Sequence, residues 1–316
     1  MEKVAIIGSG TMGHSIALAA AMANFNVRIF GINEDDITNA RKGLEGKIKI
    51  LVANEVLTQQ QGDEVFARIK LLTELQVVVK DATFIIEAIP ENIELKQKIY
   101  AQLEELVDET TIIASNTSGI MPSILADKMK HPNRLVITHF YNPAHLVPLV
   151  EVVGGKKTDE ATIERSMAMM NAFNKKPIKI EKEIAGFVGN RLQFALFREA
   201  QYLYKKGIAS KEDIDAAVKY SIGRRLSVTG PLLSADMTGL DVVEDICNYL
   251  FIDLSDEKSV GEPIKALVSN NNLGFKTGKG YYQWTEALSK EINAAREQML
   301  IDHLKKDLKK KRESGW

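Results

Sequence analysis

The chain has 316 residues, a length that suggests two domains rather than one. Hydrophobic residues make up 45% and charged residues 26%, as is usual for a globular protein with a packed core. The net charge of −1 gives no electrostatic footprint for nucleic acid or an anionic membrane. One cysteine, Cys247, excludes an internal disulfide and is typical of a reducing compartment. With no signal-peptide architecture and no apolar run long enough to cross a membrane, we expect a cytoplasmic protein.

Up to about residue 184, short β-branched runs alternate with longer helical patterns. The runs are Val4–Ile7, Val27–Phe30, Phe84–Ile86, Ile112–Ala114, Leu135–Thr138 and Val150–Val153. Strands separated by helices predict right-handed crossovers and a mainly parallel, doubly wound α/β sheet of the Rossmann type. Between the second and third of these strands, residues 35–75 follow a helical period and predict a long helical excursion.

After Ile184 the pattern becomes helical. Apolar residues from Val188 to Leu203 mark one face of a helix that Gly207 stops, and Ser210 begins another capped helix. Residues 1–184 are therefore predicted to form a nucleotide-binding domain, and residues 185–316 a helical C-terminal domain.

A glycine-rich turn, G-x-G-x-x-G, lies between the first strand and the first helix. Gly8 permits the tight turn, Gly10 lets a pyrophosphate approach the backbone, and Gly13 allows close packing of helix on strand. A helix opens at His14, and its N-terminal amides would face the phosphates, with Thr11 and Met12 of the turn also expected at the cofactor. A turn without a ligand is the weaker alternative, because the motif stands between a strand and a helix near the start of the chain.

The second strand lacks the acidic residue that normally bonds the adenosine ribose. Gly31 stands in that place, and Asp35 and Asp36 come later in the chain. A glycine removes both the bond to NAD and the repulsion that excludes the 2′-phosphate of NADP. Since no arginine follows that could bind the 2′-phosphate, NAD is the favoured cofactor, and NADP is kept as an alternative. We expect Gly31 to face the cofactor and the preference to be soft.

His139 and Glu151 lie on two strand-like pieces that a short loop joins. A histidine within reach of a carboxylate becomes an oriented base near neutral pH. The spacing alone is equally compatible with two unrelated polar residues.

In combination with later motifs, these features resemble the 3-hydroxyacyl-CoA dehydrogenase family. The matching segments run through both predicted domains: Gly8–Gly13, Ile86–Asn92, Ser115–Ser118, His139–Pro143, Leu149–Val152, Ala185–Arg191, Gly230–Leu232, Asp236, Gly239–Asp241 and Lys276–Tyr281.

The resemblance implies that His139 is the base that takes the hydroxyl proton and that Glu151 supports its imidazolium. It implies that Ser118 and Asn190 hydrogen-bond the reacting oxygen in a cleft between the domains. The other implied contacts are Glu91, Lys96 and Ser118 to the cofactor, and Ser118 and Asn142 to the substrate. Taken singly, these polar residues are equally typical of turn and helix caps. No histidine–carboxylate cluster has metal-ligand spacing, so no metal is predicted.

The resemblance points to two different substrate classes. Family members that use coenzyme A esters carry lysines in the helical excursion, but Ile50–Leu57 has none, although Lys47 and Lys49 lie one turn earlier. Pro148 and Arg225 resemble instead the branch of gulonate and carnitine dehydrogenases, where Arg225 would clamp a free carboxylate.

By contrast, Asp236, Gly239–Asp241 and Lys276–Tyr281 favour the acyl-CoA branch. We therefore expect an NAD-dependent 3-hydroxyacyl-CoA dehydrogenase of fatty-acid or short-chain acyl-CoA metabolism. The alternatives are a dehydrogenase of a free 3-hydroxy acid and a non-catalytic, nucleotide-binding protein like the lens λ-crystallins. The expected partners are a small-molecule substrate and a second copy of the chain, which would dimerise through residues after about 185.

Overall fold

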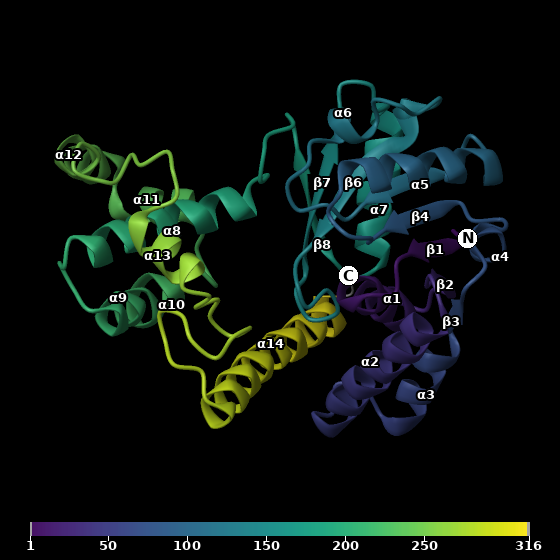
Figure 1. The fold of residues 1–316 in the computed structure, drawn as a ribbon, viewed down its shortest axis with the longest axis horizontal. Helices are drawn as coiled ribbons and strands as arrows, with labels where there is room; N and C mark the ends of the chain where they lie inside the picture. Colours follow the sequence, from purple (N-terminus) through teal and green to yellow (C-terminus); the bar gives the residue numbers. More distant parts are fainter. Residues whose placement is uncertain (1, 315–316) are drawn as a thin grey trace. The chain divides into compact units, whose positions relative to one another are not determined.

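The computed structural model describes residues 2–314, which form two compact units (Figure 1). Unit 1 contains the chain up to Val188 together with the residues from Ala295 onward, and unit 2 contains Gly189–Ala294. The helical domain had been predicted to extend to the C-terminus, so the return of the chain to unit 1 is a correction. Its cause is apolar packing: Ile301 is 1% exposed within the core of unit 1, and Leu300 and Leu304 pack against that core.

Unit 1 is a doubly wound α/β domain, as predicted. Its elements in chain order are β1 (Val4–Ile7), α1 (Thr11–Met22), β2 (Val27–Phe30), α2 (Glu34–Ala53), α3 (Gln59–Ala67), β3 (Ile69–Leu72), α4 (Leu75–Val79), β4 (Phe84–Glu87), α5 (Ile93–Leu106), β5 (Ile112–Ser115), α6 (Pro122–Leu125), β6 (Leu135–Phe140), β7 (Leu149–Gly154), α7 (Glu160–Ala172) and β8 (Lys176–Ile180). The eight-stranded sheet has the order β3-β2-β1-β4-β5-β6-β7-β8. Neighbouring strands are parallel except β6 and β7, which are antiparallel.

The core of unit 1 has one layer on each face of this sheet. Alternate residues of β1 point to opposite faces, so Val4 and Ile6 belong to one apolar cluster and Ala5 and Ile7 to the other. The first cluster includes side chains of α1, α2, α3 and α7, and the second those of α4, α5 and α6. The inner strands are buried on both sides, which explains their nearly continuous apolar sequences.

Two strands, β3 and β8, were absent from the prediction. The excursion after β2 is therefore two helices and a strand: α2 ends at Ala53, α3 starts after a capping box at Thr58, and β3 pairs with β2. Both missed strands lie at edges of the sheet and are partly exposed, so their apolar patterns are incomplete.

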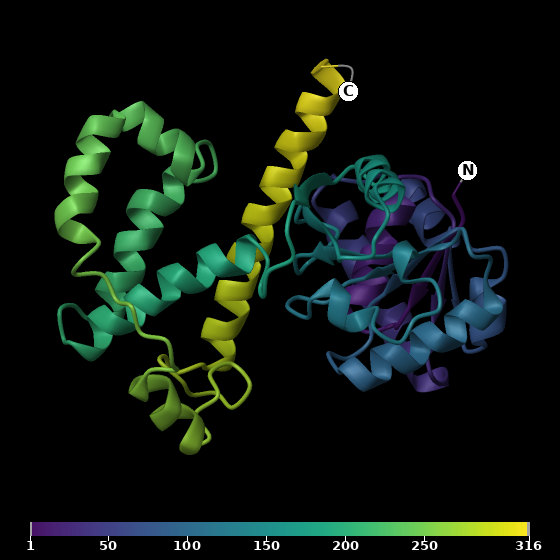
Figure 2. The same ribbon diagram turned by 90° about the horizontal axis from the view of Figure 1, so that it is seen from above.

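Unit 2 is helical, in agreement with the prediction. It contains α8 (Gly189–Lys205), α9 (Lys211–Ala217), a π-helical turn (Val218–Ile222), α10 (Gly223–Arg225), α11 (Pro231–Thr238), α12 (Leu240–Leu250), α13 (Glu262–Ser269) and the first residues of α14 (Glu286–Ser314). Gly207 adopts a φ of +66° after α8, and Ser210 caps α9 by accepting the Asp213 N–H. Figure 2 shows α14 as one continuous helix. None of the described helices is both long and apolar enough to span a membrane.

Candidate active site

The glycine-rich turn has the geometry of a phosphate cradle. Gly8 has a φ of +111°, and a Cβ there would lie 2.6 Å from the Ala88 carbonyl oxygen. A Cβ on Gly13 would lie 1.8 Å from the Gly8 carbonyl oxygen, so α1 packs directly on the turn. A Cβ on Gly10 would meet nothing within 4 Å, so a ligand can approach the backbone there. The first-turn amides of α1, including those of Thr11 and Met12, have no acceptor within the helix and suit an anion.

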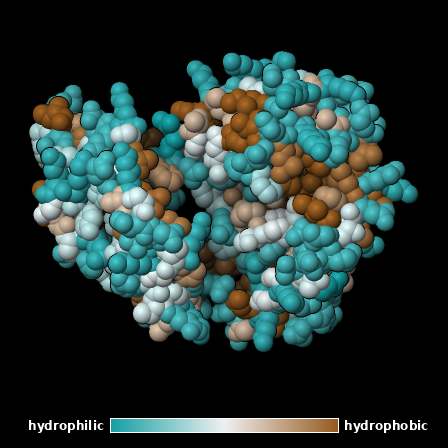
Figure 3. Space-filling model, viewed as in Figure 1, coloured by the Kyte–Doolittle hydropathy of each residue, from teal (hydrophilic) through white to brown (hydrophobic). Residues whose placement is uncertain are grey.

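The turn opens onto a cavity of about 1430 Å³ within unit 1. It lies beyond the carboxyl ends of β1, β2 and β4, where the strand order reverses and dinucleotides bind in sheets of this kind. Its lining includes Gly31 and apolar side chains such as Leu95 and Ile99 of α5. Figure 3 shows hydrophobic residues at the surface of unit 1 in this view. The volume exceeds the roughly 300–1,000 Å³ of most ligand pockets, and the open face at Gly10 fits a dinucleotide.

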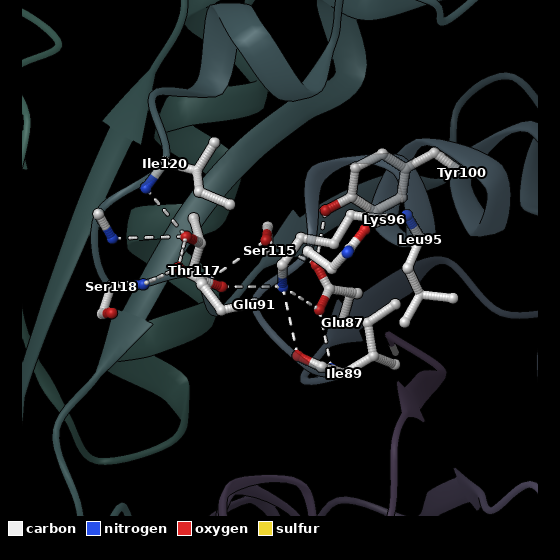
Figure 4. A network of polar contacts seen from close by, with 12 residues as sticks. Glu87, Ile89, Glu91, Leu95, Lys96, Tyr100, Ser115, Thr117, Ser118 and Ile120 are labelled. Carbon is white, nitrogen blue, oxygen red and sulfur yellow. Dashed lines mark hydrogen bonds and ion pairs between the residues drawn. The ribbon is translucent and has the colours of Figure 1, made fainter.

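A buried carboxylate at the end of β4 organises one wall of the site (Figure 4). Glu87 accepts hydrogen bonds from Lys96 Nζ at 2.6 Å and from the Ile89 N–H at 2.8 Å. Its other oxygen accepts from Tyr100 Oη at 2.5 Å and Ser115 Oγ at 2.7 Å. Burial, together with the Glu87 charge, raises the pKa of Tyr100 well above its ordinary value, so the phenol stays a donor. The four donors satisfy the hydrogen-bonding capacity of this buried carboxyl group.

The same network reaches the predicted cofactor contacts. Lys96 Nζ also lies 3.3 Å from Glu91, whose other oxygen accepts from the Thr117 hydroxyl and, at 3.2 Å, from the Ser118 N–H. The Lys96 side chain is only 1% exposed and lies between Glu87 and Glu91, so it holds both carboxylates in place, and its predicted contact with the cofactor stays a prediction. Glu91 is 43% exposed and Ser118 is exposed, so both stay accessible to a ligand.

His139 and Glu151 are brought together by the antiparallel pairing of β6 and β7. They are directly opposed in register, and His139 Nδ1 lies 2.8 Å from Glu151 Oε2, with both residues buried. Glu151 also accepts from Tyr141 Oη at 3.0 Å and from the Val188 N–H at 2.9 Å. Because Nδ1 faces a carboxylate, it carries the proton, and Nε2 keeps the lone pair that a general base needs.

The loop that carries Ser118 is tied to the strand that carries His139. Asn116, just after β5, accepts the Phe140 N–H at 2.9 Å, so the ends of β5 and β6 are held side by side. Asn142 is exposed in the loop after β6. Asn190 lies in the first turn of α8 and Arg225 at the end of α10, both in unit 2. Their participation in one site with His139 stays a prediction.

The two lysines of α2 that precede Ile50–Leu57 have different surroundings. Lys47 is half-buried, and its Nζ lies 2.9 Å from His14 Nε2. Burial lowers the pKa of Lys47, and the nearby Glu297 of α14 opposes that shift. Lys49 is exposed, and two residues along a helix correspond to about 200° of rotation, so the two lysines project in different directions.

Several residues that build the site had been given no role from the sequence. Glu87, Asn116 and Tyr141 all lie within or beside recognised motifs, but only the structure shows what each one holds. The available signal for Glu87 was a lone charge that closes an apolar strand, where an unpaired carboxylate would be unfavourable.

The family follows from two matches that together cover both units. Residues 3–184 match the model of the 3-hydroxyacyl-CoA dehydrogenase NAD binding domain, and residues 186–284 match that of the 3-hydroxyacyl-CoA dehydrogenase C-terminal domain. The chain belongs to the 3-hydroxyacyl-CoA dehydrogenase family. It is accordingly an NAD-dependent dehydrogenase that acts on a CH–OH group, as predicted.

Relatives within this family carry different substrate names. A 5-formyl-3-hydroxy-2-methylpyridine 4-carboxylate 5-dehydrogenase of Mesorhizobium japonicum is 32% identical over 301 residues, covering 95% of this chain and 96% of that protein. A 3-hydroxybutyryl-CoA dehydrogenase of Clostridioides difficile is 33% identical over 285 residues, covering 90% of this chain and 100% of that protein. A solved structure of an enzyme with the first activity, described as an NAD⁺-dependent dismutase, has a TM-score of 0.90 and 31% identity, covering 97% of this chain and 98% of its own.

Proposed function

We propose that this dehydrogenase oxidises the hydroxyl group of a 3-hydroxy acid that carries a free carboxylate, with His139 as the general base. The observation that supports the catalytic part is the buried His139–Glu151 pair at 2.8 Å. His139 Nε2 takes the hydroxyl proton, and the imidazolium that forms is neutralised by Glu151. The chemistry that NAD supplies when bound is acceptance of the hydride from C3, so that the alcohol becomes a ketone.

The remaining residues of the proposed site bind and orient. The backbone at Gly10 and the first-turn amides of α1 would hold the pyrophosphate of NAD. Glu91, positioned by Lys96, faces the same region of unit 1 as the exposed Ser118. Ser118 and Asn190 are proposed to hydrogen-bond the reacting oxygen, and Asn142 to contact the substrate.

Three features support a free carboxylate over a coenzyme A ester. Lys47 contacts His14, and Glu297 stands near it, so this lysine is less available to nucleotide phosphates than an exposed one. The match to the C-terminal family model ends at residue 284, before α14, which packs Ile301 into unit 1. The relative named for a pyridine carboxylate aligns over 301 residues, whereas the relative named for 3-hydroxybutyryl-CoA is fully covered by 285.

A 3-hydroxyacyl-CoA is the second candidate substrate, and it was the one expected from the sequence. The family assignment supports it, as do Asp236, Gly239–Asp241 and Lys276–Tyr281. The three features given above for a free carboxylate are the reason for placing it second.

A matched kinetic comparison tests the substrate class. Reduction of several free 3-oxo acids and of acetoacetyl-CoA would be followed by loss of NADH absorbance under identical conditions. We expect kcat/KM for the best free acid to exceed that for acetoacetyl-CoA at least tenfold, about 1.4 kcal/mol of transition-state binding. The opposite ratio would reject the free-acid proposal and leave the NAD-dependent dehydrogenase class intact.

We also propose that two copies associate through unit 2. Apolar side chains of α11, α12 and the segment after α12 are exposed, including Leu232 at 84%, Phe251 at 66% and Ile252 at 87%. Apolar surface of this kind marks an interaction site more often than a free face. Light scattering should give twice the chain mass of 35.1 kDa, and a monomer would reject the proposal. A cytoplasmic location stays a prediction.

A further inference from the structure

The end of β2 poses a problem for NAD binding. In sheets of this kind a carboxylate there receives the adenosine ribose hydroxyls and repels the 2′-phosphate of NADP. Gly31 occupies the position, is buried, and lines the cavity without offering a side chain. An enzyme that depends on NAD must therefore recognise the ribose with another group or recognise it weakly.

A carboxylate-bearing residue stands next to position 31. A Cβ built on Gly31 would lie 3.4 Å, an ordinary contact distance, from Cβ of Asp36 in the first turn of α2. Asp36 also lines the cavity. Its Oδ2 accepts the Ile32 N–H at 3.3 Å, and its own N–H is held by the Asn33 cap at 2.8 Å, so both its backbone and its side chain are anchored.

The neighbouring acids do not share this arrangement. Glu34 and Asp35 belong to the same first turn, but both are exposed and neither lines the cavity, whereas Asp36 is half-buried. Successive helical residues differ by about 100° in direction, which explains why only one of the three faces the nucleotide site.

We propose that Asp36 supplies from α2 the ribose-binding carboxylate that β2 lacks, and that it makes the enzyme strongly selective for NAD over NADP. An ionised carboxylate has about four lone-pair sites, so the bond from Ile32 leaves acceptors for ribose hydroxyls. The negative charge repels a 2′-phosphate at the same place. The soft preference expected from Gly31 alone is thereby replaced by a firm one. This inference rests on NAD binding and is independent of the proposed substrate.

One consequence is that an aspartate at position 31 would not repair the site. A Cβ there would lie 2.8 Å from Ile37 Cδ1 and 3.0 Å from Ser9 Oγ, so both side chains would have to move. A second carboxylate would also stand beside that of Asp36. We therefore expect Gly31→Asp to weaken NADH binding.

The test is a fluorescence titration of NADH and NADPH without substrate, on the wild type, Asp36→Asn and Asp35→Asn. For the wild type, the Kd of NADPH should exceed that of NADH at least about 100-fold. Asp36→Asn keeps an oxygen for the Ile32 N–H but removes the charge. It should weaken NADH about tenfold and tighten NADPH, so that the ratio falls about 100-fold. Asp35→Asn removes the same charge one residue away and should leave both affinities within about twofold.

Three outcomes would overturn the proposal. The first is wild-type binding of NADPH as tight as that of NADH, which does not depend on how any variant folds. The second is an unchanged ratio in Asp36→Asn, since a residue that only braces the loop is replaced by asparagine without consequence. The third is an equal change in Asp35→Asn, which would show a general effect of charge. Because no substrate is present, failure of the free-acid proposal would not alter these results.

Discussion

Replacing Glu151 with glutamine tests the role of the His139–Glu151 pair, because the hydrogen bonds of Glu151 leave little room for an amide. Glu151 accepts hydrogen bonds from His139, Tyr141 and the Val188 N–H, which are all donors. Glutamine has nearly the same size but only one acceptor oxygen, and its NH₂ group is a donor. Whichever way the amide is turned, a donor therefore faces a donor inside a buried site.

The two orientations have different costs. If the amide oxygen stays with Val188, the NH₂ group faces His139 Nδ1 and favours the tautomer with its proton on Nε2. Wrong-tautomer variants of this kind lose about 10⁴ in kcat. If the oxygen turns to His139, the buried Val188 N–H loses its acceptor, at about 1–3 kcal/mol, and the imidazolium loses its counter-charge. Either way we expect kcat to fall by about 10²–10⁴.

Steady-state NAD reduction at saturating substrate measures this loss, and an NADH titration shows whether the cofactor site survives. The affinity for NADH should stay within about twofold, because Glu151 does not line the nucleotide cavity. Tyr141→Phe is the matched control, since it removes one hydrogen bond but keeps the charge, and should lower kcat less than about tenfold. A Glu151→Gln enzyme within about threefold of the wild-type kcat would refute the assigned role.

Three further predictions concern other parts of the molecule. His139→Gln should lower kcat by about 10²–10⁴ with an unchanged Kd for NADH, and retained turnover would reject it as the base. Burial, aided by nearby cationic groups, lowers the pKa of His145 to about 3 from 6.5. Between pH 6.5 and pH 3, the unfolded chain binds a proton at this histidine and the folded chain does not. The free energy of unfolding therefore falls with falling pH, by up to about 1.4 kcal/mol per pH unit. Denaturant unfolding from pH 6.5 to 4.5 should show a shallower loss in His145→Gln than in His131→Gln. If a free acid is the substrate, Arg225→Met should lower kcat/KM by an amount that corresponds to about 2–3 kcal/mol, because the charge-assisted bond to the carboxylate is lost. Arg224→Met is the control, and an equal loss in both variants would reject Arg225 as the residue that binds the carboxylate.

Much of the sheet was predictable because burial on both faces gives strands such as Val4–Ile7 an unbroken apolar sequence. The edge strands were not, since β3 and β8 are partly exposed and β8 contains Pro177. The return of α14 to unit 1 also escaped prediction. Ile301 lies in a helix rich in charged residues, and a helical pattern does not say which unit its apolar face covers.

The candidate site was also only partly predictable from the sequence. The pairing of His139 with Glu151 was predictable only through the family resemblance, because their spacing alone fits two unrelated polar residues equally well. The antiparallel register of β6 and β7 places the two opposite each other. The burial of Lys96 was not, because a lysine in a sequence gives no sign that two carboxylates enclose it. The role proposed for Asp36 depends on how the chain turns after Gly31 and on which side of α2 meets the cavity. Both are properties of the folded backbone.

The most direct test of the account is to follow the hydrogen on C3 itself. The enzyme would be given NAD and 3-hydroxybutyrate deuterated at C3, both as the free acid and as the coenzyme A thioester, and the NADH formed would be analysed by mass spectrometry. We predict that deuterium appears in the NADH, and that His139→Gln forms almost no NADH. NADH without deuterium, no NADH from either form, or an undiminished rate in His139→Gln would contradict it.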